Sequence, residues 1–322
     1  MTSSMQALWL EDKILSYRPE VPINPPNPGE ALIRMRIAGI CATDLEMVKG
    51  YYPFTGIPGH EFVGEVVQAP GYPTWIGQRV VGEINIACHQ CENCRAGMPT
   101  HCQQRRVLGI KDQHGAFAEY LLLPIENLHP VPASVPDEIA VFTEPLAAAL
   151  EIQEQVHIHP GEQVLVIGAG RLGQLIAQSL VLTGCDLWVL VRHEAQRQQL
   201  NRPGIHCLSE DELKRQRWDL VVEATGSSSG FQLARQAVRP RGTIILKSTY
   251  KGELQTSFSS LVVEEIQLIG SRCGPFPPAL RLLESGHVDP SILIAEKYSL
   301  AEGKVAFEQA ARPGMLKVLL AP

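Results

Sequence analysis

The chain has 322 residues, of which 45% are hydrophobic and 19% charged, and 28 basic against 34 acidic residues give a net charge of −6. This is the composition of a globular protein large enough for two domains, and it excludes a predominantly disordered chain. The acidic balance, without a block of lysines or arginines, argues against a nucleic-acid partner.

The first twenty residues carry Glu11 and Asp12 where a signal peptide would need an uninterrupted apolar core. No run approaches eighteen apolar residues, so we expect neither a secretory leader nor a membrane span. The expected location is cytoplasmic, where thiols stay reduced and disulfides are rare.

The first 145 residues combine Pro- and Gly-rich turns with short β-type runs and contain little helical periodicity. The runs are ALIRMRIAG (31–39), GEVVQA (64–69), QRVVGEI (78–84) and AEYLLL (118–123). This pattern predicts an irregular, strand-dominated region.

Potential metal ligands lie in three turn-rich or apolar stretches of this region, GICATDLE (39–46), GIPGHEFVGE (56–65) and FTEPLAAALE (142–151). They are Cys41, His60, Glu61 and Glu144, a mixture of soft, borderline and hard ligands. Singly, these residues have ordinary explanations: a small core residue, a hydrogen-bonded turn histidine and a carboxylate at a helix start. Together they indicate a metal site that only folding could assemble.

Between these stretches, the segment CHQCENCRAGMPTHC holds Cys88, Cys91, Cys94 and Cys102. Their spacing allows four thiolates to converge on one tetrahedral ion, and four sulfur ligands leave no position for a substrate. We therefore interpret the cluster as a structural zinc site. Disulfides, free thiols and a nucleic-acid-binding zinc module are the less favoured alternatives.

From residue 163 onward, short continuous apolar runs alternate with helix-sized segments. The runs are QVLVI (163–167), LWVLV (187–191), DLVVE (219–223) and TIILK (243–247). Runs that are apolar on both faces and separated by helices predict a parallel sheet covered on both sides, in an α/β domain.

The first of these runs leads directly into IGAGRLGQLIAQSL, which places Gly168, Gly170 and Gly173 in the arrangement G-x-G-x-x-G before a helical pattern. The glycines allow a tight turn, a close approach of a pyrophosphate to the backbone and close packing of helix on strand. With a strand before it and a helix after it, the motif predicts dinucleotide binding.

The end of the second run indicates which dinucleotide. Where NAD-binding chains usually place an acidic residue, about twenty residues beyond the glycines, this chain has Arg192 and His193, with Arg197 one turn further. Cations there can pair with a 2′-phosphate, so NADP is favoured over NAD. The alternative is that Arg192 is a solvated surface residue and Glu194 takes the acidic role.

Eight segments in order along the chain resemble the zinc-dependent medium-chain dehydrogenase/reductase superfamily, which contains the alcohol and polyol dehydrogenases. Besides the four cysteines, they are GICATD (39–44), PGHE (58–61), HGAFAEYLLLP (114–124), TEPLA (143–147), GAGRLG (168–173), EATG (223–226) and IGSRCG (269–274). The resemblance implies a Rossmann doubly wound parallel sheet over 147–270, and a split, partly open GroES-like β-barrel formed by 1–146 and 271–322.

The resemblance also implies roles for individual residues. The catalytic zinc would be held by Cys41, His60 and Glu144, with Glu61 adjacent to the metal and able to ligate it, and Thr43 would contact the substrate oxygen through its hydroxyl. A second zinc would be held by the four cysteines. From the glycine motif and the residues after the second run, the expected contacts of the cofactor are Gly168, Gly170, Arg171, Leu172, Gly173, Arg192, His193 and Arg197. Many relatives carry a proton-relay histidine five residues after the zinc cysteine, where this chain has Glu46.

The function implied is hydride transfer between a nicotinamide cofactor and a small or medium alcohol or polyol, or the corresponding aldehyde or ketone, by a homodimer or homotetramer. Two alternatives remain open at this point. One is a biosynthetic carbonyl reductase with only its structural zinc filled, and the other is a non-catalytic dinucleotide-sensing protein.

Overall fold

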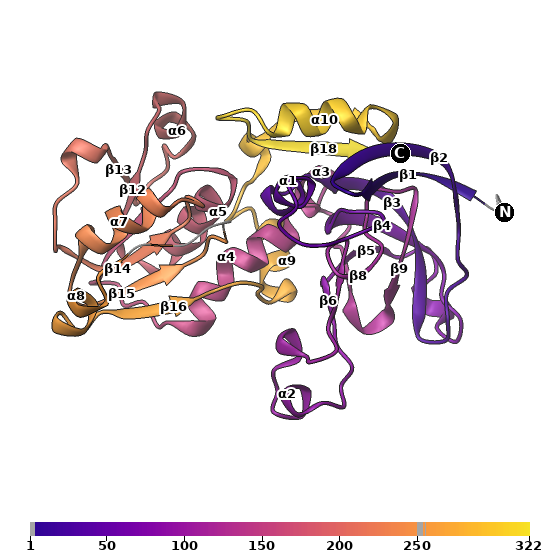
Figure 1. Cartoon of the computed structure of the whole chain (residues 1–322), viewed down its shortest axis with the longest axis horizontal. Helices are drawn as coiled ribbons and strands as arrows, with labels where there is room; N and C mark the ends of the chain where they lie inside the picture. Colours follow the sequence, from indigo (N-terminus) through magenta and orange to yellow (C-terminus); the bar gives the residue numbers. More distant parts are fainter. Residues whose placement is uncertain (1–3, 250–253, 255) are drawn as a thin grey trace. The chain divides into compact units, whose positions relative to one another are not determined.

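The computed structural model describes residues 4–249, 254 and 256–322 and contains two compact units (Figure 1). The first unit comprises the chain up to Glu144 together with Phe276–Gly286 and Pro290–Pro322. The second comprises Pro145–Pro275 and His287–Asp289. The first unit is therefore built from segments at both ends of the sequence.

The described part of the first unit is mainly β-structure, as its turn-rich sequence predicts. Its strands are β1 (Ser4–Glu11), β2 (Ile14–Pro22), β3 (Glu30–Gly39), β4 (Glu61–Gln68), β5 (Arg79–Gly82), β6 (Asn85–Ile86), β7 (Arg106–Leu108), β8 (Asp112–Gln113), β9 (Tyr120–Pro124), β10 (Leu128–Pro130), β17 (Ile294–Ser299) and β18 (Lys317–Ala321). Its helices are α1 (Ala42–Val48), α2 (Glu92–Arg95), α3 (Asp137–Ala140), α9 (Phe276–Glu284) and α10 (Gly303–Ala310).

Strand β3 is at the centre of the main sheet of this unit. It pairs antiparallel with β4, with β9 and, at its carboxyl end, with the C-terminal strand β18. The register places Gly39 opposite both Glu61 and Leu319. The start of β4 and the last strand of the chain therefore meet at the end of β3, directly before the turn that carries Cys41.

A small lobe built from β6, α2, β7 and β8 projects from the sheets of the first unit (Figure 1). Helix α2, at the end of the lobe, contributes no buried residue, whereas β6 and β7 bury Ile86, Val107 and Leu108. A cross-link by a metal or by disulfides is the usual way to stabilise such a segment.

The second unit has a six-stranded parallel sheet with helices between its strands. Its elements are β11 (Gln163–Ile167), α5 (Arg171–Leu180), β12 (Asp186–Leu190), α6 (Glu194–Gln199), β13 (Ile205–Leu208), β14 (Trp218–Glu223), α7 (Ser228–Ala237), β15 (Val238–Leu246), α8 (Phe258–Val263) and β16 (Gln267–Gly270). Helix α4 (Thr143–Gln155) begins at the boundary between the units.

The order of the strands in this sheet is β13-β12-β11-β14-β15-β16. The strand order reverses between β11 and β14, and such a point is where Rossmann sheets bind dinucleotides. Val164–Ile167 of β11 are fully buried, because helices cover both faces of the strand. The predicted α/β fold with a parallel sheet is thus confirmed.

Among the residues that the structure describes, no helix has both the length and the apolar character required to cross a membrane.

Candidate functional site

The four clustered cysteines converge within the projecting lobe. The sulfur atoms of Cys88, Cys91, Cys94 and Cys102 all lie within 4.8 Å of one another, and none is in a disulfide. Cys91 Sγ lies 3.5 Å from Cys94 Sγ and 3.9 Å from Cys102 Sγ. Helix α2 begins directly after Cys91 and brings Cys94 back beside it.

The surroundings of these thiols are suited to a cation. Backbone N–H groups point at the sulfurs, as from Cys88 to Cys102 Sγ at 3.3 Å and from Cys91 to Cys88 Sγ at 3.4 Å. The N–H groups of Gln103 and Cys94 lower the pKa of the Cys91 thiol to about 6. Desolvation and the neighbouring thiols raise the pKa of Cys94 to about 12. Four thiols at this spacing cannot all ionise unless a cation compensates their charges, so the donor set fits a zinc ion.

A second group of possible metal ligands lies at the end of β3. One ligand atom each of Cys41, His60 and Glu61 falls within 4.8 Å of the others. Cys41 stands directly before helix α1, and His60 and Glu61 lie at the start of β4, so the pairing of β3 with β4 brings the three together. Both His60 and Glu61 are buried, while Cys41 is partly exposed.

Asp44 organises this group from the first turn of α1. Its Oδ2 accepts a hydrogen bond from the Cys41 backbone N–H at 2.8 Å, and its Oδ1 lies 3.3 Å from His60 Nδ1. Burial lowers the pKa of His60, but the charges of Asp44 and Cys41 and their hydrogen bonds outweigh burial and raise it well above 6.5. A carboxylate behind a histidine fixes the ring so that its other nitrogen faces the metal.

Glu61 has a buried cationic partner that the sequence did not reveal. Lys317 of β18 forms an ion pair with Glu61 Oε2, and its ammonium also donates to the Ile40 carbonyl oxygen at 3.4 Å. A Cβ atom on Gly39 would lie 2.5 Å from Glu61 Oε2, so any side chain there would require the carboxylate to shift. Glu61 Oε1 is buried and has no hydrogen-bond partner within the described chain.

The donor set of this second group also fits a zinc ion. A thiol, an imidazole and a carboxylate are ordinary zinc ligands, and Asp44 adds a further acidic group next to them. The unpartnered, buried Glu61 Oε1 is a polar atom that a cation would satisfy. With only these protein ligands, a position would stay open for a substrate, in contrast to the cysteine cluster.

The other expected members of this site have different surroundings. Thr43 Oγ1 lies 3.8 Å from Cys41 Sγ. Glu46 forms an ion pair with Lys49 at 2.7 Å on the outer face of the helix, as a solvated residue does. Glu144, in the first turn of α4, does not belong to the group of ligand atoms within 4.8 Å. Its predicted role as a zinc ligand stays a prediction.

The glycine-rich turn joins β11 to α5 in the second unit. Gly168 has a φ of +111°, and a Cβ atom there would lie 2.7 Å from the Ala224 carbonyl oxygen. A Cβ atom on Gly173 would collide with the carbonyl of Gly168, whereas one on Gly170 would meet open space. The turn therefore packs tightly against the strand end and leaves room outside Gly170, next to Arg171 and Leu172 at the start of α5, which suits a pyrophosphate.

The basic residues after β12 differ in how firmly they are held. Arg197 donates to the Cys207 carbonyl oxygen at 3.0 Å and lies 3.7 Å from Glu194, so it is engaged within the unit. The side chain of Arg192 is exposed to solvent, and its backbone N–H donates to Gln196 Oε1 at 2.9 Å. His193 stands directly before α6. Arg192 is thus the cation best placed to reach a ligand at the end of β12.

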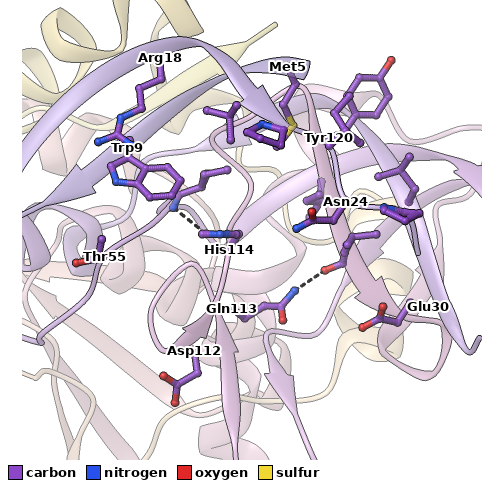
Figure 2. Close-up of a pocket in the computed structure, with 18 of the residues that line it drawn as sticks. Met5, Trp9, Arg18, Asn24, Glu30, Thr55, Asp112, Gln113, His114 and Tyr120 are labelled. Carbon is purple, nitrogen blue, oxygen red and sulfur yellow. Dashed lines mark hydrogen bonds between the residues drawn. The ribbon is translucent and has the colours of Figure 1, made fainter. Parts of the chain in front are cut away.

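The first unit also has an open cavity of about 950 Å³, and none of Cys41, His60 and Glu61 lines it. Figure 2 shows Trp9 and His114 side by side in it, with ring centroids 5.3 Å apart. His114 Nδ1 accepts a hydrogen bond from the Ile57 backbone N–H at 3.2 Å, and burial lowers its pKa below 6.5. This cavity is distinct from the metal-type site.

Comparison with known proteins matches both units. A model of the alcohol dehydrogenase GroES-like domain matches residues 27–133, and a model of ketopantoate reductase PanE/ApbA matches residues 164–237. The chain is 31% identical to L-galactonate-5-dehydrogenase from Escherichia coli over 309 residues, 90% of each chain. It is 29% identical to D-arabinitol dehydrogenase 1 from Uromyces fabae over 317 residues, 91% of this chain and 90% of the other.

Among solved structures, a zinc-binding dehydrogenase from Sinorhizobium meliloti 1021 bound to NADP superimposes with a TM-score of 0.91. It is 27% identical, and the match covers 100% of both chains. The similarity thus extends over the split first unit and the parallel-sheet unit alike.

Proposed function

Because the chain belongs to the zinc-dependent medium-chain dehydrogenase/reductase family, we propose that it transfers a hydride between a nicotinamide cofactor and a small or medium alcohol or polyol. The reverse reaction is reduction of the corresponding aldehyde or ketone. The observation that carries the proposal is the grouping of Cys41, His60 and Glu61 beside the buried Asp44. The names of the relatives, L-galactonate-5-dehydrogenase and D-arabinitol dehydrogenase 1, support polyhydroxy substrates.

In this proposal Cys41, His60 and Glu61 hold the catalytic zinc, with Glu144 as a further ligand. When bound, zinc acidifies a substrate hydroxyl or polarises a carbonyl, while the nicotinamide accepts or donates the hydride. Asp44 keeps His60 oriented through the contact at Nδ1, and Lys317 holds one oxygen of Glu61 while the other stays available. Thr43, beside Cys41, would contact the substrate oxygen through its hydroxyl.

We further propose that the four cysteines hold a structural zinc, which gives two zinc ions per chain. The closed set of sulfur donors around a helix that buries none of its own residues supports that role. Elemental analysis of the purified protein tests both sites at once. Two zinc ions per chain support the proposal, and one ion would favour the carbonyl reductase with only its structural zinc.

Replacement of the zinc cysteine separates an enzyme from a dinucleotide-sensing protein. Cys41→Ala should abolish turnover and leave cofactor binding intact, because the glycine-rich turn lies in the other unit. Cys207→Ala is the matched control, because it removes a partly buried thiol of the second unit, away from Cys41 in the sequence. This variant should keep full turnover. An unchanged rate in Cys41→Ala would contradict the proposed function.

For the cofactor we propose NADP in preference to NAD. The exposed guanidinium of Arg192 after β12, with His193 and Arg197 next to it, supports pairing with a 2′-phosphate, and the Sinorhizobium meliloti structure holds NADP. The apparent KM for NADP should be lower than that for NAD, and Arg192→Ala should raise only the former. Arg215→Ala, an exposed arginine elsewhere in the unit, is the control. A strong preference of the wild type for NAD would refute this part.

We also propose a homodimer or homotetramer, and the expected cytoplasmic location stays a prediction. Helix α8 and β16, at one edge of the parallel sheet, leave apolar side chains uncovered: Phe258 is 70%, Val262 75% and Val263 81% exposed. Such a surface next to a sheet edge suits contact with another subunit. Light scattering should find an oligomer for the wild type and a smaller species for Val263→Asp. A monomeric wild type at micromolar concentration would refute the proposal.

The substrate itself is best found with a panel of alcohols, polyols, amino-alcohols and aldehydes. Nicotinamide absorbance, followed with both cofactors, measures kcat/KM for each compound. The proposal requires activity on at least one class of polyols or simple alcohols.

A further inference from the structure

A buried lysine lies at the carboxyl edge of the parallel sheet, outside every group discussed so far. Lys247 directly follows β15, and the residue as a whole is 8% exposed to solvent. Its ammonium donates to Ser271 Oγ at 3.0 Å and to the Arg272 carbonyl oxygen at 2.7 Å. Both of these acceptors are neutral and follow β16.

The backbone places Lys247 in the row of residues that end the central strands. Its N–H donates to the Glu223 carbonyl oxygen at 2.9 Å, and the Ser271 N–H donates to the Leu246 carbonyl oxygen at 3.0 Å. Ala224, one residue beyond Glu223, donates to the carbonyl oxygen of Ile167 at the end of β11. Lys247 therefore stands on the same edge as the glycine-rich turn.

Other charged groups lie at this edge. The Glu223 carboxylate is bound by the N–H of Thr225 at 2.7 Å and by its hydroxyl at 2.5 Å. Glu151 of α4 interacts electrostatically with Lys247 and with Arg272; burial raises its pKa and the two cations oppose that rise. Among the residues that the structure describes at the strand ends, Lys247 contributes the buried ammonium.

The strand order indicates which part of a dinucleotide this edge would meet. A dinucleotide on such a sheet lies across the crevice where the strand order reverses, with one mononucleotide on each half. The adenosine half belongs to β11, β12 and β13, where Arg192 follows β12. Strands β14, β15 and β16 form the other half, which is left for the nicotinamide.

We propose that Lys247 is a specificity-determining residue that makes the chain bind reduced nicotinamide cofactor in preference to the oxidised form. In oxidation of the alcohol, the hydride leaves carbon for C4 of the pyridinium ring, the hydroxyl proton is released, and the positive charge of the ring disappears. A buried cation near the ring repels the pyridinium and leaves the neutral dihydropyridine unaffected. Lys247 thereby favours the state from which a carbonyl is reduced. The inference rests on the proposed function and concerns the same cofactor site.

The test measures binding without turnover. Dissociation constants are determined by calorimetry for the oxidised cofactor, the reduced cofactor and the matching ADP-ribose, which lacks nicotinamide. The measurement uses whichever phosphorylation state the wild type binds more tightly. Lys247→Met removes the charge, and Lys247→Gln removes it while keeping an N–H donor for Ser271 and Arg272. Lys214→Met is the matched control, because it removes the same charge from an exposed position of the same unit.

Both Lys247 variants should lower the ratio of the oxidised to the reduced dissociation constant about tenfold, the effect of a partly screened unit charge at close range. Affinity for ADP-ribose should stay constant, and Lys214→Met should change none of the three values. An unchanged ratio in Lys247→Gln, or equal losses for all three ligands, would overturn the inference while leaving the proposed function intact. A wild type that binds neither cofactor form would instead refute the proposed function, and this inference with it.

Discussion

The buried pair of Lys317 and Glu61 yields the most direct quantitative prediction. The side chains of Lys317 and Glu61 are 4% and 1% exposed, and the two residues lie far apart in the sequence, in β18 and β4. Lys317→Met keeps an apolar stem near Phe142, whose ring centre lies 5.8 Å from the ammonium, but leaves the carboxylate without its cation. Removal of one partner of a buried pair typically costs about 3–5 kcal/mol, because the other charge stays buried.

We expect Lys317→Met to lower the free energy of unfolding by about 3–5 kcal/mol, measured by urea denaturation of the metal-free protein at neutral pH, where no zinc ion compensates the charge of Glu61. Lys297→Met is the matched control: Lys297 lies in the neighbouring strand β17, and its ion pair with Glu138, at 3.2 Å, is 45% exposed on both sides. That exposed pair should contribute below about 1 kcal/mol.

A double variant separates the loss of the pair from the loss of packing. Lys317→Met with Glu61→Gln removes both charges, so it should recover a large part of the stability lost in the single variant. Equal losses of unfolding free energy in Lys317→Met and Lys297→Met would refute the argument that burial couples the pair. So would a double variant whose loss equals the sum of the losses in Lys317→Met and Glu61→Gln.

Three further predictions concern the lobe, the cavity and the glycine-rich turn. Cys94→Ser should remove the zinc ion proposed for the lobe and lower the thermal midpoint, as elemental analysis and calorimetry would show; a fully stable variant with a specific loss of the hydride step would contradict the structural role. His114 has its pKa lowered by burial, so its contribution to stability is present above pH 6.5 and is lost as the pH falls through its folded pKa. Between pH 7.5 and 5.5, the free energy of unfolding should therefore fall less in His114→Gln than in the wild type. Parallel pH profiles of this free energy in the two proteins would contradict the prediction. Gly173→Ala should weaken cofactor binding about tenfold, since its Cβ collides with the preceding turn, whereas Gly161→Ala, whose Cβ meets open space, should bind as the wild type does.

The sequence alone determined the features that depend on short-range patterns. Continuous apolar runs predicted the parallel sheet, because a strand buried on both faces has no room for polar alternation. The spacing of the four cysteines indicated their convergence, since a few turns of chain suffice to bring thiols together. The family was also legible, because its motifs occur in order along the chain.

Only the tertiary structure decided which groups act on one another over long separations. Lys317 lies 256 positions from Glu61 and carries no local signal; it reaches the carboxylate because β18 returns to the end of β3. Asp44 is visible three residues after Cys41, but its contact with His60 depends on the pairing of β3 with β4. Lys247 is, in the sequence, the end of an apolar run, and only the tertiary structure shows that its charge is buried at the carboxyl edge of the parallel sheet. Electrostatic interactions depend on distance in space and on burial, and neither is set by the neighbours of a residue in the chain.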